Sequence, residues 1–279
     1  MVPSMSDCKG TWIPTIRFCQ CNSGYIGENC DTLGKSCRDL VGSYKVNTRV
    51  GSYLRSTFTN ASYLTNCAIM DTGEIRTDFA NFRVTVPFYV NRTWEEYVAG
   101  FSYNVGYLTP NIYDLWVGLD NMYYLYSVSR KPARMNVHLY FGGDTLGYVF
   151  IYYNINITDS SNNYKFSYGS FATNKFPALS FPPVNATNFT NCFSSKTTPG
   201  FSAPGRDNDD DPVNDCAKQS QGGWWISSCN VEPDCNPFGV PYNSSSDPIT
   251  LERTRFKNSN IRDYVQYFSV IRIYLIESP

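Results

Sequence analysis

Five carboxylates crowd into nine residues of the sequence, at Asp207, Asp209, Asp210, Asp211 and Asp215. Acids at this density repel one another unless water or a cation screens them. Ca²⁺ takes oxygen ligands in flexible geometry, and an Asp-x-Asp stretch supplies two side-chain carboxylates followed by main-chain carbonyls. The cluster therefore has two interpretations, a calcium site and a solvated acidic loop, and its spacing alone does not separate them.

The sequence offers few residues that could carry out nucleophilic catalysis. A Ser-His-Asp or Cys-His mechanism needs a base, and His138 is the one histidine in the chain. Alternation along the sequence places His138 on the strand face opposite Val137 and Leu139, which predicts a surface or strand-packing role. No G-x-S-x-G, P-loop or H-E-x-x-H motif occurs. We therefore expect a protein that is not an enzyme.

The composition excludes several classes of protein. The chain has 279 residues, a formal net charge of -1 and 42% hydrophobic residues. That apolar content favours a folded core over disorder, and the neutral balance leaves no excess of Lys and Arg to bind nucleic acid. No stretch approaches the length of apolar sequence that a membrane-spanning helix needs, so no membrane insertion is expected.

Cysteine and glycosylation signals predict a secreted, extracellular protein. The chain has 10 cysteines, an even number that permits complete disulfide pairing in an oxidising compartment. Residues 1–7 lack the basic start and apolar stretch of a signal peptide, so we expect a fragment or a mature form. Asn-x-Ser/Thr sequons predict glycosylation. They lie at Asn60, Asn91, Asn156, Asn185, Asn188 and Asn243.

The first 31 residues contain four cysteines and little else to pack. Cys8, Cys19, Cys21 and Cys30 follow C-x10-C-x-C-x8-C. Zinc ligands favour C-x2-C spacing and a reducing compartment, so a metal site fits this pattern less well. An aromatic residue between two glycines inside the last loop resembles the second half of an EGF-like module. That resemblance implies a partial EGF-like module over residues 1–31, with Cys8 paired to Cys19 and Cys21 paired to Cys30.

The remaining chain has the pattern of short strands between turns with one short helix. Alternating apolar residues predict strands over 84–90 and 137–141, and 148–157 is a longer strand-rich run. Residues 92–98 are expected to be helical, because Asn91 is a suitable N-cap and acidic residues favour the first turn. Antiparallel strands with a few short helices predict an α+β fold.

Two separated blocks of the sequence carry a more specific resemblance. The first has Asn-Arg-Thr-Trp-Glu-Glu-Tyr-Val-Ala-Gly-Phe at 91–101 and Leu-Trp-Val-Gly-Leu-Asp-Asn at 115–121. The second has Arg-Asp-Asn-Asp at 206–209 and Gly-Gly-Trp-Trp at 222–225, with flanking cysteines. In this order and spacing they resemble fibrinogen C-terminal domains. The resemblance implies such a domain over residues 36–279, with a twisted antiparallel central sheet, short helices and a loop-rich calcium and ligand subdomain.

The resemblance also assigns the later cysteines. It implies that Cys37 pairs with Cys67 in the amino-terminal subdomain and that Cys216 pairs with Cys229 in the carboxy-terminal one. Chain-entropy arithmetic gives about 3.7 kcal/mol for closing the first loop and about 3 kcal/mol for the second. The two cysteines that remain are extra to the family pattern and are predicted to pair with each other: Cys192 and Cys235.

By the same resemblance the acidic cluster becomes a calcium site. Asp207 and Asp209 correspond to the carboxylate ligands, and main-chain carbonyls near Asp211 and Val213 complete the site together with waters. Gly205 stands where the family usually has a further acid, which is a departure from the pattern. Ca²⁺ is therefore the expected cofactor.

The resemblance implies a ligand pocket beside the same cysteine pair. Fibrinogen-like lectins hold an acetyl group there with main-chain donors, which an unusual cis peptide aims, and the matching bond in this chain is Ser228–Cys229. Asn230 lies where the family commonly has His and can still hydrogen-bond a sugar or an amide. The residues expected to bind ligand are Trp225, Ser228, Cys229, Asn230 and Tyr242.

Two functional hypotheses follow from the resemblance. The first is a secreted lectin-like protein that recognises glycans or acetylated surface groups through a calcium-supported pocket. The second is a tenascin-like or angiopoietin-like ligand or matrix protein that binds a cell-surface receptor through the same globe. The altered pocket beside a retained acidic loop favours a protein partner, whereas a lectin should keep its aromatic walls. Any oligomer is expected to form through regions outside this chain.

Overall fold

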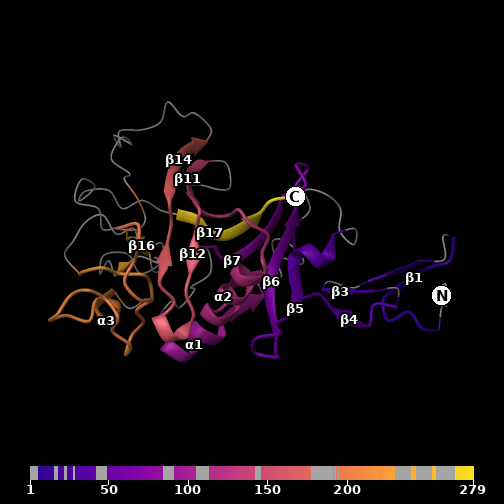
Figure 1. Cartoon of the computed structure of the whole chain (residues 1–279), viewed down its shortest axis with the longest axis horizontal. Helices are drawn as coiled ribbons and strands as arrows, with labels where there is room; N and C mark the ends of the chain where they lie inside the picture. The colour runs from indigo at the N-terminus through magenta and orange to yellow at the C-terminus, as the bar shows by residue number, and fades with distance from the viewer. Residues whose placement is uncertain are drawn as a thin grey trace.

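The structure, a computed structural model, is built around one large antiparallel sheet (Figure 1). A small disulfide-rich module lies on one side of this sheet, and a loop-rich part lies on the other. This is the expected α+β architecture. The structure describes residues 6–15, 18–21, 24–27, 29–41, 49–83, 91–104, 113–141, 146–176, 191, 193, 195–220, 222–229, 240–242, 253–255 and 268–279.

Seven strands follow one another across the large sheet, and two more join it through its fifth strand. The path runs β14 (Ser170–Phe176), β11 (Leu146–Tyr153), β10 (Ala133–Phe141), β17 (Phe268–Glu277), β7 (Ile75–Arg83), β6 (Ser62–Ile69) and β5 (Arg49–Arg55). The two that join it are β8 (Phe101–Asn104) and β9 (Tyr113–Trp116).

The smaller elements form two-stranded ladders, short helices and single turns. The ladders are β1 (Thr11–Ile13) with β2 (Phe18–Gln20), β3 (Tyr25–Ile26) with β4 (Thr32–Leu33), β12 (Asn156–Ile157) with β13 (Phe166–Ser167) and β15 (Val240–Tyr242) with β16 (Arg253–Arg255). The helices are α1 (Trp94–Ala99), α2 (Leu119–Val128) and α3 (Cys216–Ser220), with 3-10 turns η1 (Cys37–Leu40) and η2 (Ser160–Asn162). Within the described segments no helix is long and apolar enough to cross a membrane.

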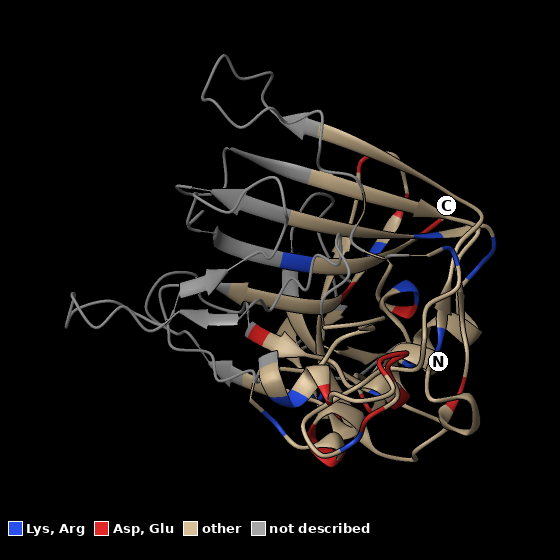
Figure 2. Cartoon of the chain, turned by 90° about the vertical axis from the view of Figure 1, so that its left-hand side faces the viewer, with Lys and Arg blue, Asp and Glu red and all other residues tan. Residues whose placement is uncertain are grey.

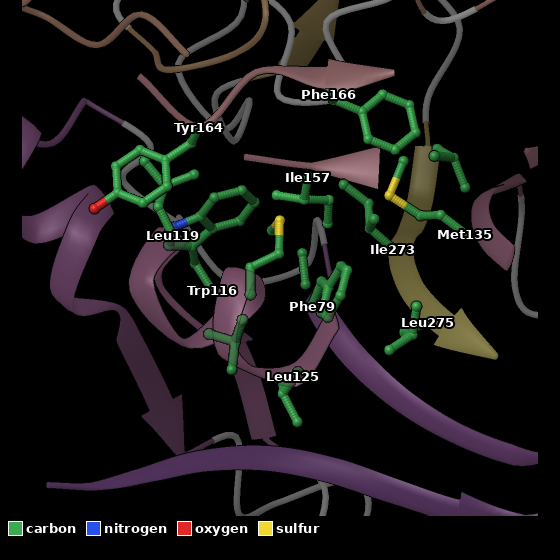
Figure 3. Packing of buried hydrophobic residues seen from close by; sticks show 14 of the residues in the cluster. Phe79, Trp116, Leu119, Leu125, Met135, Ile157, Tyr164, Phe166, Ile273 and Leu275 are labelled. Atoms are coloured by element: carbon green, nitrogen blue, oxygen red, sulfur yellow. The ribbon is translucent and has the colours of Figure 1, made fainter. Parts of the chain in front are cut away.

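One face of the large sheet packs against α2 to form the core (Figure 3). Val137 of β10 lies opposite Ile273 of β17 in the ladder, and both side chains are buried. Phe79 of β7 lies on the same side, where Leu119 and Leu125 of α2 cover the sheet. The period-two alternation of these strands therefore directs every second side chain into this core.

The opposite face of the same strands carries a polar cluster, which we call the polar face. Arg76 Nε lies 3.1 Å from Asp78 Oδ1, and Asn66 Nδ2 donates to Asp78 Oδ2 at 3.0 Å. The Arg76 guanidinium lies 3.7 Å from the centre of the Tyr274 ring, against which the His138 ring also packs. Because Asp78 and Asn66 are buried, this pairing is what makes their burial tolerable.

The strand predictions hold in part. Residues 137–141 lie within β10, as expected. The 148–157 run is not one strand, because Asn154 has a positive φ of 52° that turns the chain between β11 and β12. Residues 84–90 lie outside the described residues.

The helix predictions need two corrections. The helix expected from residue 92 begins at Trp94, and its N-cap is Thr93 instead of Asn91. Thr93 Oγ1 accepts from Glu96 N at 3.3 Å while Glu96 Oε2 accepts from Thr93 N at 3.0 Å, which is a capping box. The longer helix, α2, was not located from the sequence. Its N-cap is Gly118, which has no capping side chain, so the usual start signal is missing.

Two glycines let α1 and α2 meet backbone to backbone. Gly118 has a φ of 94°, and a Cβ on it would lie 2.7 Å from Val98 O. A Cβ on Gly100, whose φ is 95°, would lie 2.6 Å from Val117 O. Both positions therefore require glycine, for their conformation and for the close approach.

The disulfide predictions are confirmed wherever the cysteines are described. The four observed bonds join Cys8 to Cys19, Cys21 to Cys30, Cys37 to Cys67 and Cys216 to Cys229. Cys192 and Cys235 lie outside the described residues, so their pairing stays a prediction.

Backbone contacts hold the amino-terminal module against the edge strand β5. Gly34 N donates to Gly24 O at 2.8 Å, and Arg55 N of β5 donates to Gly34 O at 2.8 Å. Gly24 lies so close to the strand that a Cβ on it would be 2.0 Å from Tyr53 O. The module therefore covers this edge of the sheet.

Candidate functional site

The acidic loop is organised around the Asp209 carboxylate. Asp209 Oδ1 accepts from Asp211 N at 2.8 Å, and Asp209 Oδ2 accepts from Cys216 N at 3.1 Å. Asp207 Oδ1 in turn accepts from Asp209 N at 3.2 Å. Burial raises the pKa of Asp209 to about 6, and the charge of Asp207 adds to the rise although the two amide bonds oppose it. The Asp207 carboxylate is therefore close enough to the Asp209 carboxylate to disfavour the charged form of Asp209.

Asp211 stabilises the turn of the same loop by accepting hydrogen bonds. Its Oδ1 accepts from Val213 N and from Asn214 N, each at 3.1 Å, and its Oδ2 accepts from Ser228 Oγ at 3.4 Å. The hydrogen bonds from Val213 and Asn214 lower the pKa of the Asp211 carboxyl. This side chain therefore shapes the turn and joins it to the Ser228 segment.

The residues present fit a hard divalent cation. Asp207 is exposed and Asp209 half-buried, so an ion could reach both, and each carboxylate oxygen keeps a second lone pair. Asp211 Oδ atoms also lie within 4.8 Å of the sulfur atoms of Cys216 and Cys229. Those two sulfurs form a disulfide and offer no thiolate, so the donor set is one of oxygens, which Ca²⁺ prefers. The carbonyl ligands near Asp211 and Val213 stay a prediction.

The acidic loop and the predicted pocket form one hydrogen-bonded unit. Asp209 holds the amide of Cys216, which is disulfide-bonded to Cys229, and Asp211 holds Ser228. Asp210 N also donates to Ser227 O at 2.8 Å. Figure 2 shows acidic residues gathered among the helices and loops below the sheet. A shift in the acidic loop would therefore be transmitted directly to residues 227–229.

The pocket residues themselves differ from the expectation. Ser228 and Cys229 are half-buried at the predicted place, but the peptide bond between them is trans, and the cis bond among the described residues is Lys131–Pro132. The expected cis peptide is therefore a wrong prediction. Asn230 lies outside the described residues.

Trp225 does not line an open pocket. Its side chain is 1% exposed, and Trp225 Nε1 donates to Tyr164 O at 2.6 Å. Its ring meets Phe201 edge to face, with centroids 4.9 Å apart. The predicted role as a ligand wall is therefore corrected to a role in the core, since a ring this buried has no surface to offer. Tyr242 lies in β15, where the structure describes the backbone alone.

Tyr97 supports this region and was not found from the sequence. It lies on α1, is fully buried, and accepts from Gly223 N at 2.8 Å through its hydroxyl. A Cβ on Gly223 would lie 2.8 Å from both Tyr97 and Phe201. A larger residue would therefore clash at the second glycine of Gly-Gly-Trp-Trp. Burial raises the pKa of Tyr97, so its hydroxyl stays protonated. The run of two glycines directly before two tryptophans was the available signal for close packing.

His138 lies on the polar face, in the sheet and not in the acidic loop. Its Nε2 hydrogen-bonds the Tyr274 hydroxyl, and the two rings are 4.8 Å apart. Burial, together with the charges of Arg76 and Arg272, lowers the pKa of His138 to about 3. The predicted strand-packing role is confirmed.

Three of the six sequon asparagines are described, and all three are exposed. Asn60 Oδ1 accepts from Arg55, and Asn156 lies in β12 of the short β12–β13 ladder. Asn91 precedes α1. Glycosylation at these sites stays a prediction, and the remaining sequons lie outside the described residues: Asn185, Asn188 and Asn243.

The sheet with its core helix and disulfide-closed acidic loop defines a class of protein, the disulfide-bonded fibrinogen-type globe. The family model described as fibrinogen beta and gamma chains, C-terminal globular domain, matches residues 33–250. The chain belongs to this family, which is non-enzymatic.

Individual relatives agree with this assignment. The fibrinogen beta chain of Gallus gallus is 28% identical over 163 residues, which are 54% of this chain and 33% of that one. The chain therefore spans about a third of that relative's length. A lamprey fibrin D-dimer in complex with the peptide Gly-His-Arg-Pro-amide superposes with a TM-score of 0.60 at 20% identity, covering 88% of this chain and 74% of that one. The fibrinogen-like globe domain of human ANGPTL2 gives a TM-score of 0.60 at 19% identity, covering 88% and 100%.

Proposed function

We propose that the protein is an extracellular binding protein that uses residues 207–229 as a calcium-supported recognition surface. One observation carries the proposal: Asp209 and Asp211 hydrogen-bond Cys216 and Ser228, so the acidic loop fixes the segment that ends at Cys229. The disulfides and the exposed sequon asparagines support an extracellular location, and the four amino-terminal cysteines support an EGF-like module before the globe.

Calcium would act as a structural support of this surface. When bound, it would supply positive charge close to the carboxylates of Asp207 and Asp209; burial raises the pKa of Asp209, and the charge of Asp207 adds to the rise. The chain's own residues do the remaining work. The Asp209 and Asp211 side chains orient the amides of residues 211–216, and the Cys216–Cys229 bond ties the loop to the surface.

Between the two ligand classes, the geometry favours a peptide or protein partner over an acetylated glycan. Acetyl recognition was expected to use a cis bond at Ser228–Cys229 and an aromatic wall at Trp225, but the bond is trans and the ring is buried. Residues 227–229 are half-buried, so part of this segment is accessible to a partner. The lamprey fibrin D-dimer, which shares the fold, is known in complex with a short peptide.

The test compares three resins in calcium and in chelator. They carry acetyl groups, no added groups, or the peptide Gly-His-Arg-Pro-amide. We expect calcium-dependent retention on the peptide resin and equal behaviour on the first two. Retention on the acetylated resin alone would overturn the choice of ligand and support the lectin hypothesis. Failure on all three in calcium would count against this recognition surface.

Matched variants separate the calcium site from a general effect of charge. Asp209→Asn should remove the calcium-dependent rise in melting temperature, because Asp209 is the buried acid of the pair. Asp210→Asn removes the same charge from the same loop at an exposed position and should keep the rise. A wild-type protein saturated at about 100 times its dissociation constant should gain about 2.7 kcal/mol of unfolding free energy. No gain would mean that the site does not bind calcium.

A further inference from the structure

The two disulfides of the amino-terminal module lie against each other. Cys8 is bonded to Cys19, and Cys21 is bonded to Cys30. The sulfur atoms of Cys19 and Cys30, which belong to different bonds, are 3.4 Å apart. Both sulfurs are disulfide-bonded and carry no proton, so this short distance is a contact between two disulfides. The four sulfurs therefore form a continuous series from Cys8 through Cys19 and Cys30 to Cys21.

The inner and outer cysteines of this series differ in accessibility. Cys19 and Cys30, the inner pair, are each 2% exposed, whereas Cys8 and Cys21 are half-buried. A thiolate that arrives from solution reacts with the sulfur that it can reach. External attack is therefore directed to Cys8 or Cys21, and the sulfur expelled from the opened bond is then Cys19 or Cys30.

Backbone contacts keep the inner cysteines together when one bond opens. Lys9 N donates to Asn29 O, the residue before Cys30, at 3.0 Å. Cys19 lies in β2, which pairs with β1, and β1 begins two residues after Lys9. One short stretch of chain thus contacts the segments of both inner cysteines through hydrogen bonds that need neither disulfide. A thiolate expelled from one bond therefore stays beside the other bond.

We propose that these four cysteines form a thiol-disulfide exchange site, in which reduction by a dithiol leaves a Cys19–Cys30 bond and frees Cys8 and Cys21. The dithiol attacks Cys8, which breaks the Cys8–Cys19 bond and expels the Cys19 thiolate. The second thiol of the reductant closes its own disulfide and releases Cys8, which takes a proton. The Cys19 thiolate attacks Cys30 to form the Cys19–Cys30 bond. The electron pair of the broken Cys21–Cys30 bond leaves on Cys21, which takes the second proton.

Three features favour this product over the reduction of one bond alone. Attack on Cys21 expels the Cys30 thiolate, which attacks Cys19 and gives the same product. The new bond has a sequence separation of 11, the same as the Cys8–Cys19 bond, so chain entropy does not disfavour it. Both cysteines of the new bond are buried, which protects it from a second dithiol. The exchanged module therefore presents two thiols to solution, at the end of the molecule away from the acidic loop (Figure 1).

Partial reduction of the intact protein tests the proposal. One equivalent of dithiothreitol is added, a first alkylating reagent blocks the freed thiols, and a second reagent labels the remaining cysteines after full reduction. Tandem mass spectrometry assigns a reagent to each cysteine. We expect most of the first label at Cys8 and Cys21 and most of the second at Cys19 and Cys30. First label that is confined to a native pair, or spread evenly over every cysteine, overturns the proposal.

Single variants test the exchange step without a reductant. Cys8→Ser leaves Cys19 unpaired beside the Cys21–Cys30 bond, and exchange should move the free thiol to Cys21. Cys19→Ser is the matched control, because it leaves one unpaired cysteine and removes an inner sulfur, so its free thiol should stay at Cys8. Alkylation of each variant without reduction locates the thiol. A free thiol that stays on Cys19 in Cys8→Ser overturns the proposal.

Discussion

The sheet and the acidic loop differ in whether their acidic side chains have a basic partner. In the polar face of the sheet the buried Asp78 is paired with Arg76 and receives a hydrogen bond from Asn66. In the loop, Asp207 and Asp209 face each other, and no basic side chain of the described segments lies within ion-pair distance of either. Figure 2 shows Asp and Glu residues among the loops and helices below the sheet.

This difference shows which part of the molecule neutralises its charged groups with its own residues and which part needs an ion from solution. A buried charge that has its own partner needs nothing from solution, although losing that partner is costly. Paired like charges instead store repulsion that an external cation can relieve. We therefore expect the sheet to be indifferent to calcium and the loop to respond to it. The four predictions below test that contrast, from the largest expected effect to the smallest.

The largest effect is expected from Asp78→Ala. It leaves Arg76, whose side chain is 13% exposed, without its partner, and breaking such a largely buried pair typically costs about 3–5 kcal/mol of unfolding free energy. Calcium should not change the loss, because Asp78 lies in the sheet. Urea unfolding with and without calcium measures it. Asp210→Ala is the control, and as an exposed substitution it should stay within about 0.5 kcal/mol of the wild type. A loss that calcium reverses would contradict the separation of the two halves.

The disulfides offer a paired comparison between the halves. Replacing Cys37 and Cys67 by Ser should cost about 3.7 kcal/mol, and replacing Cys216 and Cys229 should cost about 3 kcal/mol, because the second loop is shorter. Only the second pair includes a cysteine, Cys216, whose amide donates a hydrogen bond to Asp209. Calorimetry in calcium and in chelator should therefore find the calcium response intact without the first bond and weakened without the second. Equal responses would show that the disulfide does not transmit the effect of the ion.

A smaller effect is expected where the halves meet. Tyr97→Phe removes the hydroxyl that accepts from Gly223 N and leaves that buried amide unpaired, which costs about 1–3 kcal/mol. Tyr123→Phe on α2 is the control, because Tyr123 is only partly buried. Hydrogen exchange should show faster exchange of the Gly223 amide in the first variant alone. An unchanged amide would mean that Tyr97 is not its partner in solution.

The smallest effects are the responses to pH close to pH 6, where the two halves should change stability with opposite signs. The pKa of His138 falls to about 3, below its ordinary 6.5, so the stability it contributes is complete above pH 6.5 and is lost as pH falls. The pKa of Asp209 rises to about 6, above its ordinary 3.8, so stability is gained as pH falls through 6 in chelator. Calcium should oppose that gain.

His138→Gln and Asp209→Asn separate the two contributions to the pH dependence. The first should flatten the loss of stability below pH 6.5, and the second should flatten the gain near pH 6. Because the chain has one histidine, its imidazole signals in NMR can be followed without assignment. An imidazole that titrates near 6.5 in the folded protein would contradict the buried environment of His138.

Local patterns predicted those features that depend on neighbouring residues. The strand at 137–141 and the acidic cluster followed from spacing along the chain, whereas the pairings Cys37–Cys67 and Cys216–Cys229 followed only from the family resemblance. The helix α2 was missed because its start at Gly118 carries no capping side chain. The start of α1 was misplaced because Asn91 and Thr93 are both suitable caps, and the contact with Glu96 decided between them.

Contacts between distant residues decided the rest. The sequence determined that two tryptophans follow two glycines, but only the packing of Trp225 against Phe201 and Tyr164 made it a core residue. Likewise the sequence determined the order of the acids at 207–211, whereas the fold brought Asp211 to Ser228. Burial and long-range hydrogen bonds depend on which segments meet in space, and no spacing along the chain specifies that.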